Sequence, residues 1–551
     1  MKFLKVLTNS LITGLFFSCL VGLLVWDLNI NLEFIWQDLL QFSLYLVPVY
    51  GVVIVFFAIS FFFIAQFFSD RPFKIAVISP SFLMIGFTLV LIIFHIFFRK
   101  NLRHFSTLFT PATQELLNQQ FWAFALLAAL GLLSIVAFIL YKRKLFFFIV
   151  YFLIFGAAVA YTVWQRMLFP SIPSYEKIAT LETRTIEKRI TLIALDGMSF
   201  DFIIPLSTEG KLLNISFLMD NGSWGALENF TPNVPLILNN SFNTGKFPSA
   251  HRRLSTQEYQ LINMERSIQV IPRYIFFRQV TKTGLLHTKE VIPPTHIMNI
   301  WDIFQANQTS FLREDWPYGR FDGVITPEAE TIFNRFYEDL RFETSETFLK
   351  VKQAFCSDIE VEALVTQQKE QIQPQLLYFR LPGLDEAQAY FYKYSYPDFY
   401  GEIEQEELSK YKTVLERYYQ YYDEVIGKYL AAKKDDELLV VFSPHGTETL
   451  PRWKQIFEWF FGNPDISAYH ENAPEGTIFF IGKDIAVGRN IEGMQLIDVA
   501  PTLLHYLGLP VGKDMDGIVN SAIFVEEFKS EPVLFISSYE EHEIKTPDQQ
   551  P

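Results

Sequence analysis

Residues 189–222 read RITLIALDGMSFDFIIPLSTEGKLLNISFLMDNG, and this stretch indicates the fold class of the larger part of the chain. A β-branched, apolar run at 189–195 ends in Asp196-Gly197, which predicts a buried strand followed by a turn. A helical pattern at 212–219 comes next and stops at Asn221-Gly222. A strand followed closely by a helix is typical of an α/β domain with a mainly parallel central sheet.

The same alternation continues towards the C-terminus. Further buried strands are predicted at 375–381, 437–443 and 476–482, and a long helical pattern at 408–432 separates the first two. The region from about 254 to 370 is irregular and rich in aromatic residues, so we interpret it as insertions. The α/β domain is thereby predicted to span residues 189–530, before a polar C-terminal tail at 531–551.

The N-terminal part of the chain has a different composition. Five apolar stretches each approach the length of about 20 residues that a helix needs to cross a bilayer. They lie near residues 11–26, 42–68, 75–98, 121–141 and 145–164. They predict a membrane domain of five transmembrane helices at 1–168 and a linker at 169–188. The first stretch could be a cleaved signal peptide, but it runs on to Trp26 without a small-residue cleavage site and more spans follow.

Basic residues at the ends of these stretches predict the orientation in the membrane. The larger group falls on one side and consists of Lys2, Lys5, Arg71, Lys74, Lys142, Arg143 and Lys144. The smaller group lies on the other side and consists of Arg99, Lys100 and Arg103. Since positive charge is concentrated on the cytoplasmic side, the N-terminus is expected in the cytoplasm. Five crossings then place the large C-terminal domain outside the cytoplasm.

Charge and cysteine content limit the partners of that domain. Residues 1–170 hold 11 Lys and Arg against 5 Asp and Glu, a balance of +6, so the remaining 35 basic and 55 acidic residues leave −20 on the rest. A surface of that sign cannot neutralise phosphates, which excludes nucleic acid. The two cysteines, Cys19 and Cys356, provide no disulfide framework. The partners that we expect are the lipid bilayer and an envelope or membrane protein.

Ligand-type side chains gather at the predicted strand ends. Asp196 and His445 follow strands, Asp385 comes after a third strand, and His470 lies just before a fourth. Because functional groups collect beyond the carboxyl ends of parallel strands, these residues could supply the mixed oxygen and nitrogen ligands of a zinc-type site. The spacing also allows a plainer interpretation, in which Asp196 belongs to a turn, Asp385 caps a helix and both histidines are surface residues.

Several short sequence motifs, which occur in a fixed order, give the chain a resemblance to a known family. After 189–222 come NTGKFPSAH at 243–251, LLYFRLPGLDEAQAYFYKY at 376–394, LLVVFSPHG at 438–446, YHENAPEGTIFFIG at 469–482 and IDVAPTLLHYLGLPVGKDMDG at 497–517. Together they resemble the alkaline phosphatase superfamily, in its type I phosphodiesterase and nucleotide pyrophosphatase branch, over about residues 189–528. The resemblance implies an alkaline-phosphatase-like domain and two metal ions, usually zinc, on either side of a Thr or Ser nucleophile.

Three functional positions of that family are replaced here. The nucleophile is expected ten residues before Gly245, at Pro235, which has no hydroxyl group. The ligand histidine four residues after the aspartate of the third strand is Ala389. The aspartate of the Asp-His-Gly phrase is Pro444. The chain has therefore lost the nucleophile and two metal ligands.

The resemblance also divides the remaining ligands between two metal positions. One position keeps Asp385 and His470, and the other keeps Asp196 and His445, so neither set is complete. Losing even one ligand commonly costs orders of magnitude in the function of a metal site. We therefore expect no metal, or a weakly bound divalent ion of the zinc type, at the remnant site.

These losses favour a membrane-anchored, catalytically impaired pseudoenzyme that binds or scaffolds at the cell envelope. Two alternatives stay open. The domain could be an active metal-dependent phosphodiesterase or phosphatase, or a head-group phosphotransferase. The five helices could themselves form a transporter, although ionisable residues inside the predicted spans are nearly absent apart from His95.

Overall fold

The chain divides into two compact units. The computed structural model describes residues 2–69, 75–140, 144–169, 179–181, 183–261, 266–273, 286–291, 297–314 and 325–543. The first unit consists of residues 1–174 and 247–294, and the second of residues 175–246 and 295–551. The chain therefore passes between the units after residues 174, 246 and 294, and neither unit is continuous in sequence.

The first unit is largely helical, as the apolar composition predicts. Its α-helices are α1 (Lys2–Leu28), α2 (Trp36–Leu46), α3 (Val52–Phe67), α4 (Pro80–Phe105), α5 (Pro111–Leu140) and α6 (Lys144–Met167). A π-helical turn at Val47–Gly51 joins α2 to α3. In the described part of the chain, five stretches are long and apolar enough to cross a membrane: Phe3–Leu28, Trp36–Phe67, Pro80–Leu108, Pro111–Leu140 and Leu145–Met167. The prediction of five apolar helices is confirmed.

Helix α1 extends past the C-terminal end predicted from the sequence and so includes Asp27, and α6 likewise includes Arg166. The Arg166 Nε atom lies 3.9 Å from the Asp27 Oδ1 atom, and both side chains are buried. Arg166 also donates hydrogen bonds to the backbone carbonyls of Trp26 and Leu32. The contacts of Arg166 with Asp27 and Trp26 therefore link α6 to α1.

Two buried asparagines of this unit bind the segment at 266–273. Asn29 accepts hydrogen bonds from the backbone N–H groups of Gln269 (2.7 Å) and Val270 (2.8 Å), and it donates to the Val270 carbonyl (2.8 Å). Asn101 in α4 accepts from the Arg273 N–H at 2.6 Å and donates to the Arg273 carbonyl at 3.0 Å. We call Asn29 and Asn101 the asparagine clamps. A side-chain amide offers a donor and an acceptor, so each clamp satisfies backbone groups as a strand neighbour would. A three-stranded sheet in the same unit has the order β5 (Ser267–Ile268), β4 (Gln257–Leu261), β6 (Leu286–Glu290).

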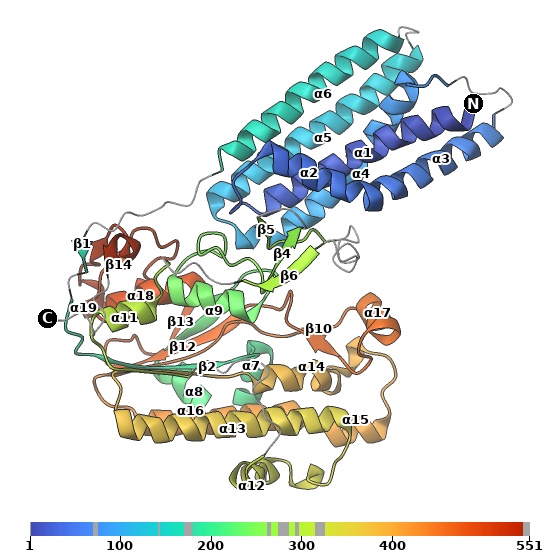
Figure 1. The fold of residues 1–551 in the computed structure, drawn as a ribbon. Coiled ribbons are helices and arrows are strands. Elements are labelled where there is room, and N and C mark those ends of the chain that lie inside the picture. Colours follow the sequence, from blue (N-terminus) through green and yellow to red (C-terminus); the bar gives the residue numbers. More distant parts are fainter. Residues whose placement is uncertain are drawn as a thin grey trace. The chain divides into compact units, whose positions relative to one another are not determined.

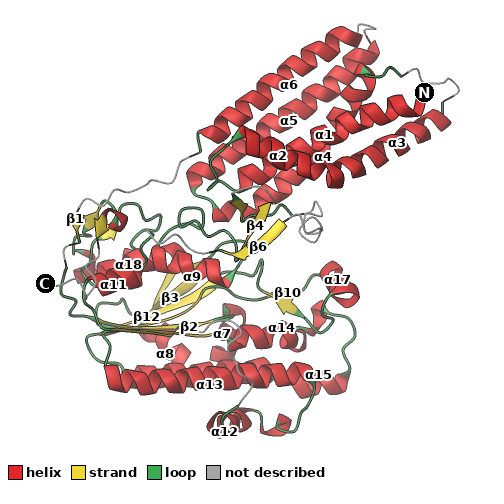
Figure 2. Ribbon diagram, viewed as in Figure 1, coloured by secondary structure: helices red, strands yellow, loops and turns green. Residues whose placement is uncertain are grey.

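The second unit is built on a seven-stranded sheet (Figure 2). Its order is β13 (Arg489–Gln495), β3 (Ser223–Glu228), β12 (Gly476–Ile481), β9 (Glu437–Ser443), β2 (Arg189–Leu195), β8 (Leu376–Leu381), β7 (Phe311–Glu314). Strands β9, β2, β8 and β7 pair in parallel, whereas β12 runs antiparallel to β9 and to β3. The sheet is therefore mixed and mostly parallel.

Helices cover both faces of this sheet (Figure 1). One layer contains α7 (Phe200–Thr208), α8 (Leu213–Asn221), α13 (Glu346–Ile372), α14 (Gly383–Ser395) and α16 (Val414–Ala432). The other contains α9 (Pro235–Thr244), α11 (Ile300–Ala306) and α18 (Val499–Tyr506). Alternate residues of the strands enter different layers: Ile193 and Leu195 join the core beneath α14 and α16. Tyr378 and Phe442 instead stack on Phe242 of α9.

The remaining elements lie around this three-layer arrangement. The single helical pattern predicted at 408–432 is two helices, α15 (Gln405–Tyr411) and α16. The others are α12 (Pro327–Phe336), α17 (Arg452–Phe461), α19 (Glu526–Lys529), and the short strands β1 (Ala179–Thr180), β10 (Glu448–Thr449), β11 (Ala468–Tyr469), β14 (Val511–Gly512), β15 (Phe535–Ile536) and β16 (His542–Glu543). Strands β10 and β11 pair antiparallel, and α17 lies between them in the sequence.

Candidate functional site

Three side chains that could bind a metal ion lie together in the second unit. Asp385 is in the first turn of α14, His445 follows β9, and His470 directly follows β11. One ligand atom from each residue lies within 4.8 Å of the other two. Strands β8 and β9 flank β2 and run parallel to it, so the segments that follow them leave the sheet at the same edge. We call these three residues the histidine cluster.

The His445 ring is held in one orientation, with its Nε2 atom free for a ligand. Its Nδ1 atom lies 3.0 Å from the Gly446 carbonyl oxygen, which can only accept, so Nδ1 carries the proton and donates. The side chain is fully buried, and its Nε2 atom has no hydrogen-bond partner in the described part of the chain. Burial lowers the pKa of His445, which favours the neutral ring. A neutral imidazole oriented by a carbonyl is the form that binds metal ions.

His470 and Asp385 form an ion pair when the histidine is protonated. The His470 Nδ1 atom lies 3.1 Å from Asp385 Oδ2 and 3.3 Å from Oδ1. Burial lowers the pKa of His470, but the charge of Asp385, its hydrogen bond and the charge of Asp196 raise it by more. Burial raises the pKa of Asp385, but His470, His445 and Arg380 lower it by more. The net result is a raised pKa for His470 and a lowered pKa for Asp385.

Asp196, the fourth predicted ligand, has a different partner. Its Oδ2 atom accepts a hydrogen bond from the Arg380 Nε atom at 2.8 Å and another from the Nη2 atom of the same guanidinium. Asp196 is fully buried and Arg380 is 7% exposed. Arg380 is on β8, opposite Ala194 of β2, so the ion pair links adjacent strands. We call Asp196 and Arg380 the arginine pair.

A close backbone contact holds the arginine pair next to the histidine cluster. Gly197 follows Asp196 with φ of +83°, and a Cβ atom there would lie 3.1 Å from the Asp385 Cα and 2.5 Å from the Gln388 side-chain oxygen. Only glycine fits both the left-handed conformation and the close approach. The Gln388 amide donates to the Gly197 carbonyl at 3.0 Å, and its oxygen accepts from the Thr447 hydroxyl. Gln388 thus ties the turn after β2, helix α14 and the loop after β9 together.

Pro235 and Pro444, two of the three positions at which the sequence is expected to differ from the family it resembles, lie beside the arginine pair. Pro235 begins α9, and with Pro444 it lines a small pocket that Asp196 and Arg380 also line. Neither proline side chain has a polar atom, so neither can attack phosphorus or bind a metal ion. Ala389 lies one turn after Asp385 in α14, and its carbonyl accepts the Ser467 N–H at 2.7 Å.

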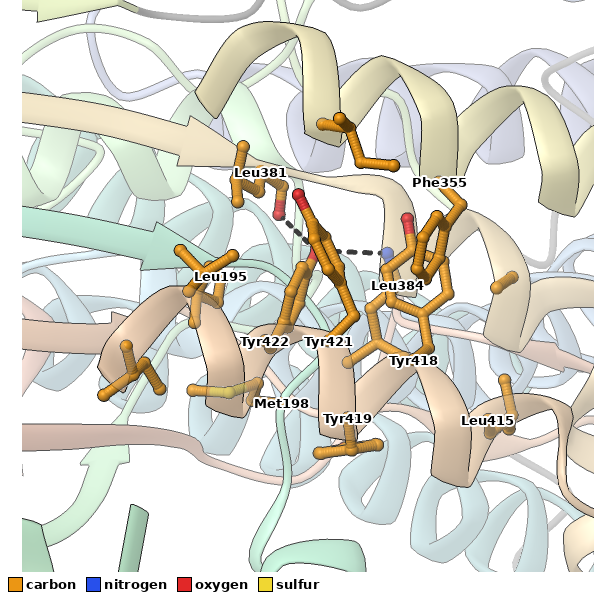
Figure 3. Packing of buried hydrophobic residues seen from close by; sticks show 14 of the residues in the cluster. Leu195, Met198, Phe355, Leu381, Leu384, Leu415, Tyr418, Tyr419, Tyr421 and Tyr422 are labelled. Carbon is orange, nitrogen blue, oxygen red and sulfur yellow. Dashed lines mark hydrogen bonds between the residues drawn. The ribbon is translucent and has the colours of Figure 1, made fainter. Parts of the chain in front are cut away.

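The buried carboxylate of Asp358 supports the start of α14. The Asp358 Oδ2 atom accepts hydrogen bonds of 2.9 Å from the hydroxyls of Tyr418 and Tyr422, and its oxygens accept the Gly383 N–H. The Tyr422 hydroxyl oxygen also lies 2.8 Å from the Leu381 carbonyl oxygen, and it accepts a hydrogen bond from the Leu384 N–H at 3.3 Å (Figure 3). Burial raises the pKa of Asp358 to about 7, although these hydrogen bonds oppose the rise. The network fixes the backbone that presents Asp385.

The two sets of side chains differ in how they fit a metal ion. The histidine cluster offers two imidazoles and one carboxylate, a set that catalytic zinc sites use while keeping a fourth position open. The arginine pair offers a carboxylate that is already neutralised by a buried guanidinium. A divalent cation at Asp196 would lie against that positive charge at low dielectric, where repulsion is strong. The residues present therefore fit one ion, at Asp385, His445 and His470.

Sequence patterns found the candidate ligands but not their surroundings. Arg380 is the charged residue of the apolar sequence LLYFRL, which predicts a buried strand. Because buried charges are usually paired, an arginine at such a position could have indicated an ion pair across the sheet. Asp358 and Gln388 lie in helices with no local signal. Their roles depend on contacts between segments that are far apart in the sequence.

Comparisons with known proteins give a likeness to solved structures. No family model matches the chain, and no curated protein matches it. Among solved structures, it is similar to an inactive variant of murine ectonucleotide pyrophosphatase/phosphodiesterase 5 in complex with AMP, at 12% sequence identity and a TM-score of 0.34. That match covers 59% of this chain and 96% of the murine chain. A likeness of this size carries no conclusion about function.

Proposed function

We propose that this chain is a membrane-anchored relative of the alkaline phosphatase superfamily whose site binds a ligand without two-metal phosphoryl transfer. The arginine pair carries this proposal. In the family that the sequence resembles, the aspartate after the first strand binds a metal ion, whereas Asp196 here binds the guanidinium of Arg380. A built-in monovalent cation therefore takes the place of a divalent ion.

Substitution of an ion by arginine changes what the site can do. A guanidinium stays protonated at all physiological pH values and has no open coordination position. It can hold an anionic group by hydrogen bonds, but it cannot lower the pKa of a hydroxyl bound to it as a metal ion does. Pro235 supplies no hydroxyl in any case. Both components of the nucleophilic step are thus missing from this half of the site.

The histidine cluster supports a role in ligand binding. Asp385, His445 and His470 would hold a single divalent ion, whose chemistry is to polarise an oxygen of a bound ligand or to lower the pKa of a bound water. Next to a guanidinium, this arrangement suits an anionic ligand such as a phosphate ester. We propose that the site holds such a ligand, in a binding or scaffolding role at the cell envelope.

Metal content and turnover of the purified full chain test this proposal. The chain in detergent would be incubated with zinc, the bound metal measured per chain, and hydrolysis of nitrophenyl phosphate and bis(nitrophenyl) phosphate assayed. We expect at most one ion per chain and no turnover above that of the His470→Ala variant. Two ions per chain, with turnover that is lost in Asp196→Asn, would contradict it.

One observation favours a second candidate, a one-metal hydrolase. Asp385, His470 and the buried His445, whose Nε2 atom has no hydrogen-bond partner in the described residues, form a three-ligand set, and catalytic zinc sites with three such ligands keep a fourth position for a reactive water. In the same assay, this candidate predicts one ion per chain with turnover that disappears in His470→Ala. The pseudoenzyme proposal predicts the ion without the turnover.

We also propose that the N-terminus lies in the cytoplasm and the second unit outside it. The support is the distribution of Lys and Arg around the five apolar helices. Protease treatment of intact spheroplasts should remove a tag at the C-terminus and leave a tag at the N-terminus protected. The reverse result would overturn the orientation.

A further inference from the structure

Helix α17 of the second unit exposes an apolar face. Trp453 is 65% exposed, Ile456 60%, Trp459 67% and Phe460 63%. Residues 453, 456 and 460 are spaced by three and four positions and so form one stripe along the helix, with Trp459 beside it. Contiguous apolar surface of this kind on a soluble domain marks an interaction site, whereas single exposed apolar residues do not.

The polar side chains of α17 bind the helix to its own domain. The Lys454 Nζ atom lies 3.2 Å from Glu471 Oε2 and 3.6 Å from the centre of the Tyr469 ring. The Gln455 amide donates to the Leu450 carbonyl at 2.6 Å. The Glu458 carboxylate accepts the Asn463 N–H at 3.0 Å. Because these contacts hold the helix by its polar side, the apolar stripe is left turned outward.

The composition of the helix fits a lipid surface. Tryptophan and phenylalanine are enriched at membrane interfaces, where a ring can lie among acyl chains with its edge at the headgroups. Exposed Arg452, next to the stripe, carries a positive charge suited to lipid phosphates. This local positive charge contrasts with the balance of −20 that the sequence after residue 170 carries. A soluble acidic partner would be expected to bind a broader basic surface than one arginine offers.

The chain itself supplies the bilayer. Five helices suited to crossing a membrane precede the second unit, and the chain passes between the units three times. Only 12 peptide steps separate Met167, at the end of α6, from Ala179 in β1. Fully extended, they reach at most about 43 Å. A tether of this length gives the apolar stripe a high effective concentration at the membrane surface.

We propose that α17 is an interfacial helix that inserts Trp453, Ile456, Trp459 and Phe460 into the outer layer of the bilayer in which the chain is anchored. The helix lies in that surface and does not span it, because 10 residues of helix measure only about 15 Å. This inference stands whether or not the histidine cluster is catalytic.

Site-directed spin labelling of the full chain tests the proposal. Cys19 and Cys356 would be changed to Ala, and a nitroxide attached through Trp459→Cys or, separately, Ile456→Cys. The matched control is Phe342→Cys, a position 79% exposed in the same unit but outside α17. Each protein would be reconstituted in vesicles of phosphatidylcholine and phosphatidylglycerol. Collisions with oxygen, which dissolves in lipid, and with a nickel chelate, which stays in water, are then compared.

We expect the ratio of oxygen to nickel collisions to be several-fold higher at 459 and 456 than at 342. An equal ratio at all three positions would overturn the proposal, because the stripe would then be in water. Spin–spin broadening at 459 that disappears on dilution with unlabelled chain would also overturn it, because a second copy would then cover the stripe. Two labelled positions in α17 guard against the loss of one variant through misfolding.

Discussion

The histidine cluster and the arginine pair lie side by side at one edge of the sheet, yet they satisfy their buried charges in opposite ways. The arginine pair carries a permanent internal cation: the Arg380 guanidinium donates two hydrogen bonds to one carboxylate oxygen of Asp196. The histidine cluster pairs its carboxylate with an imidazole, which is a cation only when it is protonated, and the buried Nε2 atom of His445 has no hydrogen-bond partner in the described residues. The comparison indicates that the arginine pair serves as an ion pair within the fold, whereas the histidine cluster offers a set of ligand-type atoms to a metal ion.

The largest change in stability is expected from removing the cation of the arginine pair. In Arg380→Met, Asp196 would be left as a buried, uncompensated carboxylate, which costs about 3–5 kcal/mol. Chemical denaturation of the full chain, followed by near-ultraviolet circular dichroism, measures the loss. The double variant Asp196→Asn/Arg380→Met should recover much of it, because both charges are then gone. Equal losses in the single and double variants would show that shape, not charge, makes this pair important.

A smaller loss of stability is expected when the hydrogen bonds around Asp358, which fix the start of α14, are weakened. Tyr422→Phe removes hydrogen bonds to Asp358, Leu381 and Leu384, and a buried partner left unpaired costs about 1–3 kcal/mol. The matched control is Tyr421→Phe, a buried tyrosine next to Tyr422 in α16 (Figure 3), because the tyrosine hydroxyls described as bonding to Asp358 are those of Tyr418 and Tyr422. Similar denaturation midpoints for the two variants would rule out the positioning role of the Tyr422 hydroxyl.

The comparison also predicts that the histidine cluster, and not the arginine pair, binds zinc. Loss of a ligand in His445→Ala should lower the affinity for zinc at least about tenfold, since even outer-sphere changes cost that much. Titration calorimetry of the full chain measures the affinity, with His287→Ala as control, because His287 is an exposed histidine outside the cluster. Asp196→Asn should leave zinc affinity nearly unchanged. A similar drop in Asp196→Asn would mean that the arginine pair takes part in metal binding.

The smallest effect is the dependence of stability on pH in metal-free protein. His470 has a raised pKa, so its stabilisation is complete below the ordinary histidine value of about 6.5 and is lost as pH rises through the raised value. Asp385 has a lowered pKa, so its stabilisation is present above about 3.9 and is lost as pH falls through the lowered value. The pair should therefore contribute most between about pH 4 and 6.5.

Thermal unfolding of the metal-free chain at a series of pH values measures this contribution. The melting temperature should fall from mildly acidic to alkaline pH by on the order of 1 °C more than in His470→Gln. Parallel curves for the two proteins would show that the ion pair with Asp385 has no influence on stability.

Local sequence patterns predicted much of the framework because buried strands have a strong signature. The runs at 189–195 and 437–443 are strands with those limits, since each is apolar and bounded by turn residues. Strand ends also pointed to Asp385, His445 and His470, which the structure brings together. The direction of β12 had no such signal, because an apolar run does not show which way a strand pairs.

Tertiary contacts determine which residue lies beside Asp196. Arg380 meets Asp196 only because β8 and β2 align with Arg380 opposite Ala194. No pattern within either segment encodes that register. The same is true of Gln388, whose partners Gly197 and Thr447 lie in segments distant from it in the sequence.

The asparagine clamps have a consequence for how the protein is made. During synthesis, β2 and β3 leave the ribosome before the segment bound by the clamps, whereas the neighbours of β2, strands β8 and β9, follow only after it. Strands β2 and β3 therefore have no neighbouring strand of the sheet until after the clamped segment has been synthesised, and incomplete sheets of this kind are prone to aggregation. A polypeptide started at residue 175 would lack Asn29 and Asn101, and the backbone groups of Val270 and Arg273 would lose their partners. Such a polypeptide should therefore aggregate or be proteolysed more readily than the full chain.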